Sequence, residues 1–231
     1  SKFKYDKSRF LKTSGRLVTI AFNLSSVSHS LLSFIFFAIS CAEALAIIQI
    51  SDLVSEGTYM EIGSHRGKSG MSAAVGLKKG ALYAVDPIFE DVGIADAVTD
   101  LIFDVNFGNI AVIAIADYSV NVIDKHAPYS YIFWDSGEHA GEVLKRETEL
   151  LEDALISGGI LCSHDIGNQF TQQKEALDYL VSTGKYEWIY IDWQPIFDYV
   201  KENNLEEGNN SWHLYPELSH PPNFIGALRR K

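Results

Sequence analysis

The stretch TYMEIGSHRGKS, residues 58–69, contains a short β-rich run that leads directly into a glycine turn. Its first part, TYMEI at 58–62, has the residues expected of a buried strand. Gly63 and Gly67 follow, and glycine allows the backbone to turn sharply and to pass close to a ligand. Residues 68–78 predict a helix, whose N-terminal N–H groups can face an anion such as a carboxylate. The stretch therefore predicts the first unit of an α/β domain with a ligand site at the turn.

The alternation of β-rich and helical stretches continues from residue 58 to the end of the chain. Most of the β-rich runs are almost continuously apolar, which is typical of parallel strands that are covered on both faces. We therefore predict an α/β fold with a mostly parallel sheet and crossover helices. The expected strands are 58–62, 81–86, 110–116, 129–135, 159–165, 186–192 and 223–229. The expected helices are 68–78, 91–105, 118–126, 140–156 and 170–183, with Gly158 and Gly159 ending the helix 140–156.

Composition limits the classes of partner. The chain has 231 residues, a net charge of −11 and a pI near 5.0. An acidic surface repels phosphate backbones, so we expect a small-molecule partner and no nucleic acid. The two cysteines, Cys41 and Cys162, form neither a disulfide framework nor a zinc motif. A reducing, cytoplasmic location is therefore expected.

The N-terminal part, residues 1–50, forms a separate segment of basic and apolar character. Residues 1–16 carry six basic side chains, and residues 31–50 form an apolar run long enough to cross a bilayer. Polar residues interrupt this run, and a glutamate at Glu43 is costly in lipid. We favour a helix that is buried or lies at a homo-oligomer interface over membrane contact or a cleaved signal.

Acidic residues stand at the ends of the expected strands. In an open α/β sheet, ligands bind outside the carboxyl ends of the strands. A structural sheet does not require an acid at nearly every strand end, so these carboxylates suggest hydroxyl, amine or metal ligands in one crevice. The five acids are Glu61, Asp86, Asp117, Asp135 and Asp165.

The glycine turn has the pattern E-x-G-x-x-x-G from Glu61 to Gly67. A dinucleotide site would show G-x-G-x-x-G, and here His65 stands where the second glycine would be. The chain also has no G-x-x-x-x-G-K-[ST] pattern, which excludes a P-loop. Asp86 ends the second strand and lies 23 residues after Gly63, where nucleoside-binding α/β folds carry an acid for the ribose hydroxyls.

Five stretches together resemble the class I S-adenosylmethionine-dependent methyltransferases, and more narrowly the O-methyltransferases that include macrocin-type and cephalosporin-hydroxylase-like proteins. The resemblance covers Thr58 to Gly167, in MEIGSHRGKSG (60–70), YAVDP (83–87), IADYS (115–119), IFWDSGEHAGEVLKRETELL (132–151) and GGILCSHDIG (158–167). It implies a Rossmann-like sheet of seven strands with helices on both faces, and FIGALRR resembles the last, antiparallel strand. It also implies that residues 51–231 form an S-adenosylmethionine-binding domain that methylates a small hydroxylated molecule.

The resemblance implies a role for each matching residue. The methionine part of the cofactor would be surrounded by Glu61, Gly63, Ser64, Gly67 and Ser69. Asp86 would bind the ribose hydroxyls, Asp117 and Tyr118 would lie beside the adenine, and Asp135 would lie under the sulfonium.

A second group of residues follows the fourth and fifth strands. In related methyltransferases the acid after strand four and the two residues that end strand five hold a divalent cation, Mg²⁺ or another. Here these are Asp135, His164 and Asp165. His139 is a candidate general base beside Asp135. This chain has D-S-G-E-H where the family usually has a D-G-D-H type of run, so metal dependence stays open.

Two further hypotheses remain beside the methyltransferase. One is a non-catalytic protein that keeps the cofactor fold for binding or assembly, with its N-terminal helix as an oligomer interface. The other is an NAD-dependent oxidoreductase, against which the missing G-x-G argues. The aromatic segment 193–222 either covers an acceptor pocket or packs as a surface loop.

Overall fold

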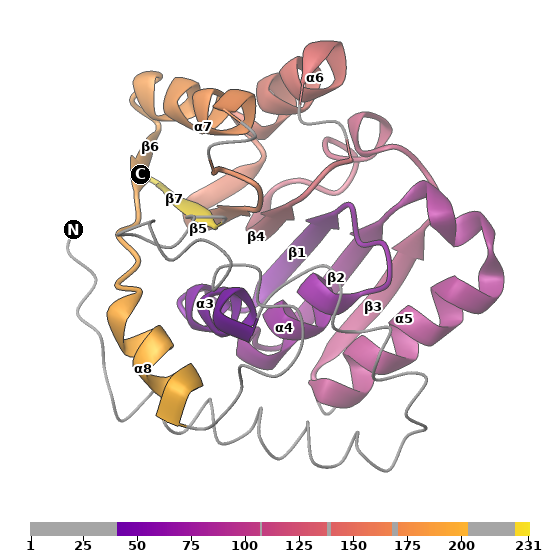
Figure 1. The fold of residues 1–231 in the computed structure, drawn as a ribbon. Coiled ribbons are helices and arrows are strands. Elements are labelled where there is room, and N and C mark those ends of the chain that lie inside the picture. The colour runs from indigo at the N-terminus through magenta and orange to yellow at the C-terminus, as the bar shows by residue number, and fades with distance from the viewer. Residues whose placement is uncertain (1–40, 107, 138–139, 168–170, 203–224) are drawn as a thin grey trace.

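The computed structural model describes residues 41–106, 108–137, 140–167, 171–202 and 225–231, which form a seven-stranded sheet with helices around it (Figure 1). The strand order is β3-β2-β1-β4-β5-β7-β6. The strands β1 to β5 are parallel, and β7 is antiparallel to both of its neighbours, β5 and β6. The Rossmann-like, mostly parallel sheet with one antiparallel last strand is thereby confirmed. The bounds are β1 Gly57–Ile62, β2 Gly80–Val85, β3 Ile110–Ile115, β4 Tyr129–Trp134, β5 Leu155–Ser163, β6 Tyr186–Trp188 and β7 Gly226–Arg230.

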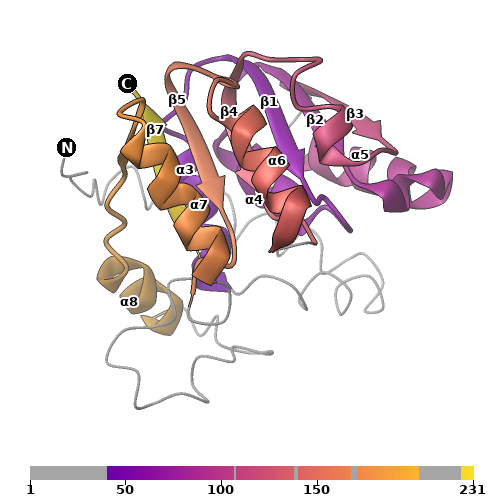
Figure 2. The same cartoon turned by 90° about the horizontal axis from the view of Figure 1, so that it is seen from above.

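Helices cover both faces of this sheet (Figures 1 and 2). The helices α3, α4 and α5 pack on one face and α6 and α7 on the other, each over a separate core. Side chains alternate between the two cores along a strand, so Tyr59 faces the first core and Met60 the second. The helix α8 packs on α3. The bounds are α3 Cys41–Ser51, α4 Lys68–Gly76, α5 Val92–Val105, α6 Gly141–Leu151, α7 Thr171–Ser182 and α8 Gln194–Glu202.

The helix expected at 118–126 is wrong. The structure has a short 3₁₀ helix there, η2 (Ser119–Asn121), followed by turns. The carboxylate of Asp117 accepts hydrogen bonds from the N–H of Tyr118 and from the side chain of Asn121. Such local bonds between side chain and backbone compete with α-helix formation, and the sequence pattern did not reveal them.

The boundary expected at Gly158 and Gly159 is also wrong. The helix α6 ends at Leu151, and β5 already begins at Leu155, which pairs with Tyr129. The two glycines lie inside β5, at an irregularity in its pairing with β4. Gly158 has a φ of 79°, so these glycines serve the irregular strand and do not end a helix.

At the other edge of the sheet, β6 ends at Trp188, earlier than expected. Ile189 and Ile191 pack instead against the hydrophobic clusters that include residues of α3. The chain therefore leaves the sheet before residue 192. The strand expected at 223–229 is observed as Gly226–Arg230, and residues 223 and 224 lie outside the described residues.

The described part of the N-terminal apolar run forms α3, which is buried against α4 and the sheet. Residues 1–40, with the basic stretch and the first half of the run, lie outside the described residues. Within the described residues, no helix has both the length and the apolar character needed to cross a membrane.

Candidate functional site

The loops that carry the predicted site residues begin at one edge of the sheet. Ile62 pairs with Trp134, and Trp134 pairs with Ser163, so β1, β4 and β5 end at the same level. Backbone hydrogen bonds continue this alignment by one residue. The N–H of Asp135 donates to Ile62 O at 3.0 Å, and the N–H of His164 donates to Trp134 O at 3.1 Å. Register therefore brings the glycine turn, Asp135 and His164 side by side.

The glycine turn fits tightly against the loop after β4. Gly63 has a φ of 75°, and a Cβ added to it would lie 1.8 Å from the backbone oxygen of Asp135. Gly67 has a φ of 79° and stands directly before α4, where a Cβ would lie 2.8 Å from Val98 Cγ1. Both positions need glycine, for backbone conformation and for space.

Glu61 lies beneath this turn and is 1 % exposed. The hydroxyls of Ser64 and Ser69 both donate hydrogen bonds to its carboxylate. Burial raises the pKa of the Glu61 carboxyl to about 7, although the two hydroxyls lower it in part. The structure thus brings Glu61, Ser64 and Ser69 together, with Glu61 holding the turn from inside.

Asp86 accepts hydrogen bonds from two loops at this edge of the sheet. Its Oδ2 accepts from the N–H of His65 at 2.7 Å, in the glycine turn. Its Oδ1 accepts from the N–H of Ile88 at 2.9 Å, at the start of the 3₁₀ helix η1 (Pro87–Glu90). Asp86 therefore fixes the distance between the glycine turn and the loop after β2.

Asp117 and Tyr118 follow β3 at the same edge of the sheet. The hydrogen bonds from Asn121 and from the Tyr118 N–H lower the pKa of Asp117 below its ordinary value, so this carboxylate is ionised at neutral pH. The ring of Tyr118 is 66 % exposed. An ionised acceptor thus lies next to an exposed aromatic surface.

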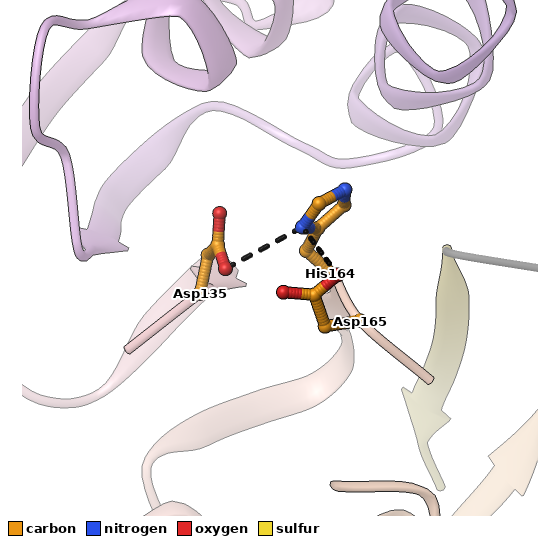
Figure 3. A group of neighbouring side chains, drawn as sticks. All are labelled: Asp135, His164 and Asp165. Carbon is orange, nitrogen blue, oxygen red and sulfur yellow. Dashed lines mark ion pairs between the residues drawn. The ribbon is translucent and has the colours of Figure 1, made fainter. Parts of the chain in front are cut away.

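Asp135, His164 and Asp165 form a compact cluster beside the turn (Figure 3). Nδ1 of His164 lies 3.5 Å from Asp135 Oδ1 and 3.3 Å from Asp165 Oδ1. One ligand atom from each residue can be chosen so that all three lie within 4.8 Å of one another. Asp165 has a φ of 56°, a left-handed conformation that is uncommon outside glycine. The cluster is the group of three residues that the sequence predicted to converge.

The charge of His164 reflects its carboxylate neighbours. Burial by itself lowers the pKa of His164. Hydrogen bonds to Asp135, Asp165 and Glu43 outweigh burial and raise the pKa to about 12. With no cation bound, the imidazolium balances part of the negative charge of the cluster.

The donor set of the cluster is suited to a divalent cation. Carboxylate oxygens are ligands for Mg²⁺ and Mn²⁺, and an imidazole shifts the preference toward transition metals. All three side chains are at least half-buried, so the desolvation that a metal site requires is already provided by the fold. Asp135, His164 and Asp165 therefore fit a metal chemically.

Sequence reasoning missed Glu43 as a member of this region. Glu43 lies on α3, is 6 % exposed, and its Oε1 is 3.3 Å from His164 Nε2. The signal was present in the sequence as one acid inside a long apolar run, which in a soluble core requires a partner. The partner is 121 residues away, and no local pattern predicts that distance.

Sequence reasoning also missed Glu147, which is 0 % exposed on α6. Its Oε2 accepts from Trp134 Nε1 and from Ser136 Oγ, each at 2.8 Å, and its Oε1 accepts from Ser119 Oγ. Glu147 thus connects the loops after β3 and β4. The sequence signal was the position of Glu147. It lies four residues before Leu151, on the apolar face of the helix α6.

Some predicted residues cannot be placed. The proposed general base His139 lies outside the described residues, as do residues 203–222 of the aromatic segment. In the described part of that segment, Ile196 and Val200 pack against α3, with Trp193 and Phe197 beside them. These aromatic residues contribute to packing between α8 and α3.

The chain matches no protein-family profile and no curated protein sequence. Solved structures do match it. A protein assigned as an rRNA methylase from Clostridium thermocellum has a TM-score of 0.53 and 16 % identity over 84 % of this chain and 98 % of its own. An O-methyltransferase from Bacillus cereus, in complex with SAH, has a TM-score of 0.50 and 14 % identity over 98 % and 92 %. The cofactor-bound protein Rv0187 from MTB has a TM-score of 0.52 and 11 % identity over 75 % and 88 %.

These similarities concern the fold. At 11 to 16 % identity they show that the chain has the architecture of S-adenosylmethionine-dependent methyltransferases. One of them is assigned as an rRNA methylase and another is described as an O-methyltransferase, so the likeness carries no substrate with it.

Proposed function

We propose that the protein is an S-adenosylmethionine-dependent methyltransferase that methylates a hydroxyl group of a small molecule. The observation that carries the proposal is the arrangement around the glycine turn. Gly63 is packed against the loop of Asp135, and Asp86 is bonded to the turn through the N–H of His65. The turn, the acid after β2 and the acid after β4 thus lie together at the carboxyl ends of neighbouring parallel strands, where the ligands of such sheets bind.

The acidic side chains at this edge of the sheet suit S-adenosylmethionine, which carries a sulfonium cation, an amino group, ribose hydroxyls and an adenine amino group. Asp86 would accept from the ribose hydroxyls, and Asp117 from the adenine amino group beside the exposed ring of Tyr118. The first turn of α4 carries no side-chain cap at Gly67, and its N–H groups would face the carboxylate of the methionine part. Asp135 would balance the sulfonium charge.

The buried residues of the turn have a positioning role in this proposal. Glu61, Ser64 and Ser69 are all buried, and Glu61 holds the two serines in place through their hydroxyls. The backbone of the turn, with Gly63, Ser64, Gly67 and Ser69, would then lie along the methionine part. The buried carboxylate and the tight packing of both glycines constrain this turn.

A divalent cation, Mg²⁺ or another, would be held by Asp135, His164 and Asp165. Bound there, it would supply the Lewis acidity that lowers the pKa of an acceptor hydroxyl. Two neighbouring hydroxyls, as on a sugar or a catechol, would suit such a site by chelation.

The proposed reaction is a direct displacement. S-adenosylmethionine supplies the methyl group: the acceptor oxygen bonds to it as its bond to sulfur breaks, and S-adenosylhomocysteine leaves. The hydroxyl proton passes to a general base, for which we propose His139. The chain itself contributes orientation and exclusion of water, which are the main contributions of a protein to such a transfer.

The acidic character of the chain supports a small acceptor. A net charge of −11 disfavours a phosphate backbone. We therefore propose a hydroxylated small molecule in preference to a nucleic acid.

Cofactor binding is the first experiment. Isothermal titration of the full chain with S-adenosylhomocysteine should show binding, and titration with NAD should not. Asp86→Asn should weaken S-adenosylhomocysteine binding at least tenfold, while Asp100→Asn, an exposed position on α5 with the same charge change, should leave it unchanged. Binding of NAD without S-adenosylhomocysteine would overturn the proposal.

Methyl transfer is the second experiment. Labelled S-adenosylmethionine and a panel of sugars, catechols and other hydroxylated acceptors should give a labelled product. His139→Ala and Asp135→Asn should each reduce the rate at least a hundredfold. If the cofactor binds and no acceptor is methylated, the non-catalytic hypothesis replaces this one.

A further inference from the structure

Glu43 is the buried acid of the site region that neither the motif pattern nor the proposed reaction uses. It lies on α3, in the N-terminal segment to which the methyltransferase resemblance does not extend. Its exposed fraction is 6 %, and α3 around it is almost wholly apolar. A buried carboxylate in such a place is costly unless a partner compensates it.

The partner is His164. Oε1 of Glu43 lies 3.3 Å from Nε2 of His164, which is itself only 9 % exposed. The other ring nitrogen, Nδ1, faces the carboxylates of Asp135 and Asp165 at 3.5 and 3.3 Å. The imidazole is therefore held between Glu43 on one side and the two aspartates on the other.

This geometry determines which nitrogen carries a proton when the ring is neutral. A carboxylate can only accept a hydrogen bond, so Glu43 requires an N–H at Nε2. The lone pair of a neutral His164 then lies on Nδ1, which points toward Asp135 and Asp165. Metal-binding histidines commonly donate their second N–H to a carboxylate, which fixes the tautomer and raises the basicity of the ligand nitrogen.

We infer that Glu43 is a positioning residue for a divalent cation: it holds His164 in the tautomer whose Nδ1 completes the cluster of Asp135 and Asp165. The inference rests on the proposed function, since it concerns the metal named there. It adds a residue from α3 that no motif contains. The N-terminal segment then takes part in the site through an interior contact.

The test measures binding of Mn²⁺ to the full chain by electron paramagnetic resonance, with no acceptor present. Glu43→Gln should weaken Mn²⁺ binding 10- to 100-fold, the range found when such a supporting carboxylate is changed. Glu175→Gln, an exposed position on α7 with the same loss of charge, should leave the affinity unchanged. Equal affinity of the Glu43→Gln variant and the unmodified chain would overturn the inference.

A second measurement follows the protonation of His164 in the unmodified chain. In the chain loaded with Zn²⁺, ¹⁵N NMR of the histidine rings should show His164 protonated at Nε2, with the resonance assigned by its loss in His164→Gln. Protonation at Nδ1 would overturn the inference.

The outcomes separate this inference from the proposed function. Mn²⁺ binding that Glu43→Gln does not weaken removes the role of Glu43 and leaves the metal site in place. A chain that binds S-adenosylhomocysteine but no Mn²⁺ loses the metal and the role of Glu43 together, while the methyltransferase stands. A chain that binds Mn²⁺ but no S-adenosylhomocysteine loses the proposed reaction, and the two measurements above still decide on Glu43.

Discussion

At the scale of single residues, Glu61 shows how a residue of the site can lower the stability of the fold. Its carboxyl is buried beneath the glycine turn, and its two hydroxyl partners only partly replace water. Burial raises its pKa from 4.5 to about 7. Keeping an ionised Glu61 at neutral pH therefore opposes folding, and the rest of the structure must compensate for it.

The pH dependence of stability should report this cost. Between pH 4.5 and 7 the folded chain keeps the Glu61 proton while the unfolded chain releases it, so stability falls as pH rises. The whole effect is about 3 kcal/mol, because one pKa unit corresponds to about 1.4 kcal/mol. Glu61→Gln cannot ionise, so its stability relative to the unmodified chain should rise across this interval in urea denaturation. Parallel stability curves for the two proteins would contradict the shift.

Gly63 provides a second prediction at this scale. Gly63→Ala places a methyl group 1.8 Å from the backbone oxygen of Asp135, so the turn or the loop must move. We expect a loss of about 3 kcal/mol or more in the free energy of unfolding, together with loss of S-adenosylhomocysteine binding. Gly184→Ala is the matched control, because Gly184 has a similar φ, 79°, but open space around it. Gly184→Ala should lower the free energy of unfolding by only about 1 kcal/mol, because only the left-handed backbone conformation is unfavourable for alanine there.

At the scale of elements, α6 connects the loops of the crevice. Glu147 accepts from Ser119 in η2, from Trp134 at the end of β4 and from Ser136 in the next loop. These three donors come from the loop after β3 and from the end of β4 with its following loop. One buried side chain therefore fixes the spacing of Asp117 and Asp135.

Removal of this connection should destabilise the chain and loosen the crevice together. Glu147→Ala leaves three buried donors without their acceptor, so we expect a loss of about 3 kcal/mol or more and weaker S-adenosylhomocysteine binding. Glu149→Ala on the same helix is the control, since Glu149 is exposed and pairs with Arg146 at the surface. Its stability should change little. Denaturation and titration of the two variants side by side check the prediction, and equal losses would contradict it.

The elements show what the sequence could predict and where it failed. The apolar runs predicted β1 to β4 nearly to their ends, because the strands of a parallel sheet covered by helices are mainly apolar. The convergence of Asp135, His164 and Asp165 was predictable, because neighbouring parallel strands end at one edge. The helix at 118–126 failed because hydrogen bonds of Asp117 replaced it. Glu43 and Glu147 could not be assigned because their partners are set by packing over long sequence distances.

At the scale of the whole molecule, α3 is part of the same folded unit as the sheet. Ile47 and Ile48 lie in the core shared with α4, β1 and β2. Glu43, on the same helix, reaches the carboxyl end of β5 through His164. The segment before the first strand is thus connected both to the hydrophobic core and to the site.

A core substitution in α3 should therefore affect the entire chain. Ile48 is 1 % exposed, and Ile48→Ala should lower the free energy of unfolding by about 3 kcal/mol. Far-UV circular dichroism and tryptophan fluorescence should still report one coincident transition, because α3 shares its hydrophobic core with the sheet. Val92→Ala, at a position that is 67 % exposed, should change little. Two separate transitions would show that α3 unfolds independently.

The position of β7 has a consequence for how the protein is made. β6 ends at residue 188 and pairs only with β7 among the described strands, and β7 begins at residue 226. At ribosomal speeds of about 5–20 residues per second, the nascent chain holds β6 without a neighbour for about 2–8 seconds. During this interval β5, which ends just before His164, also lacks its antiparallel partner β7. The strand β7 therefore enters the sheet between β5 and β6 only after both of these neighbours have been made.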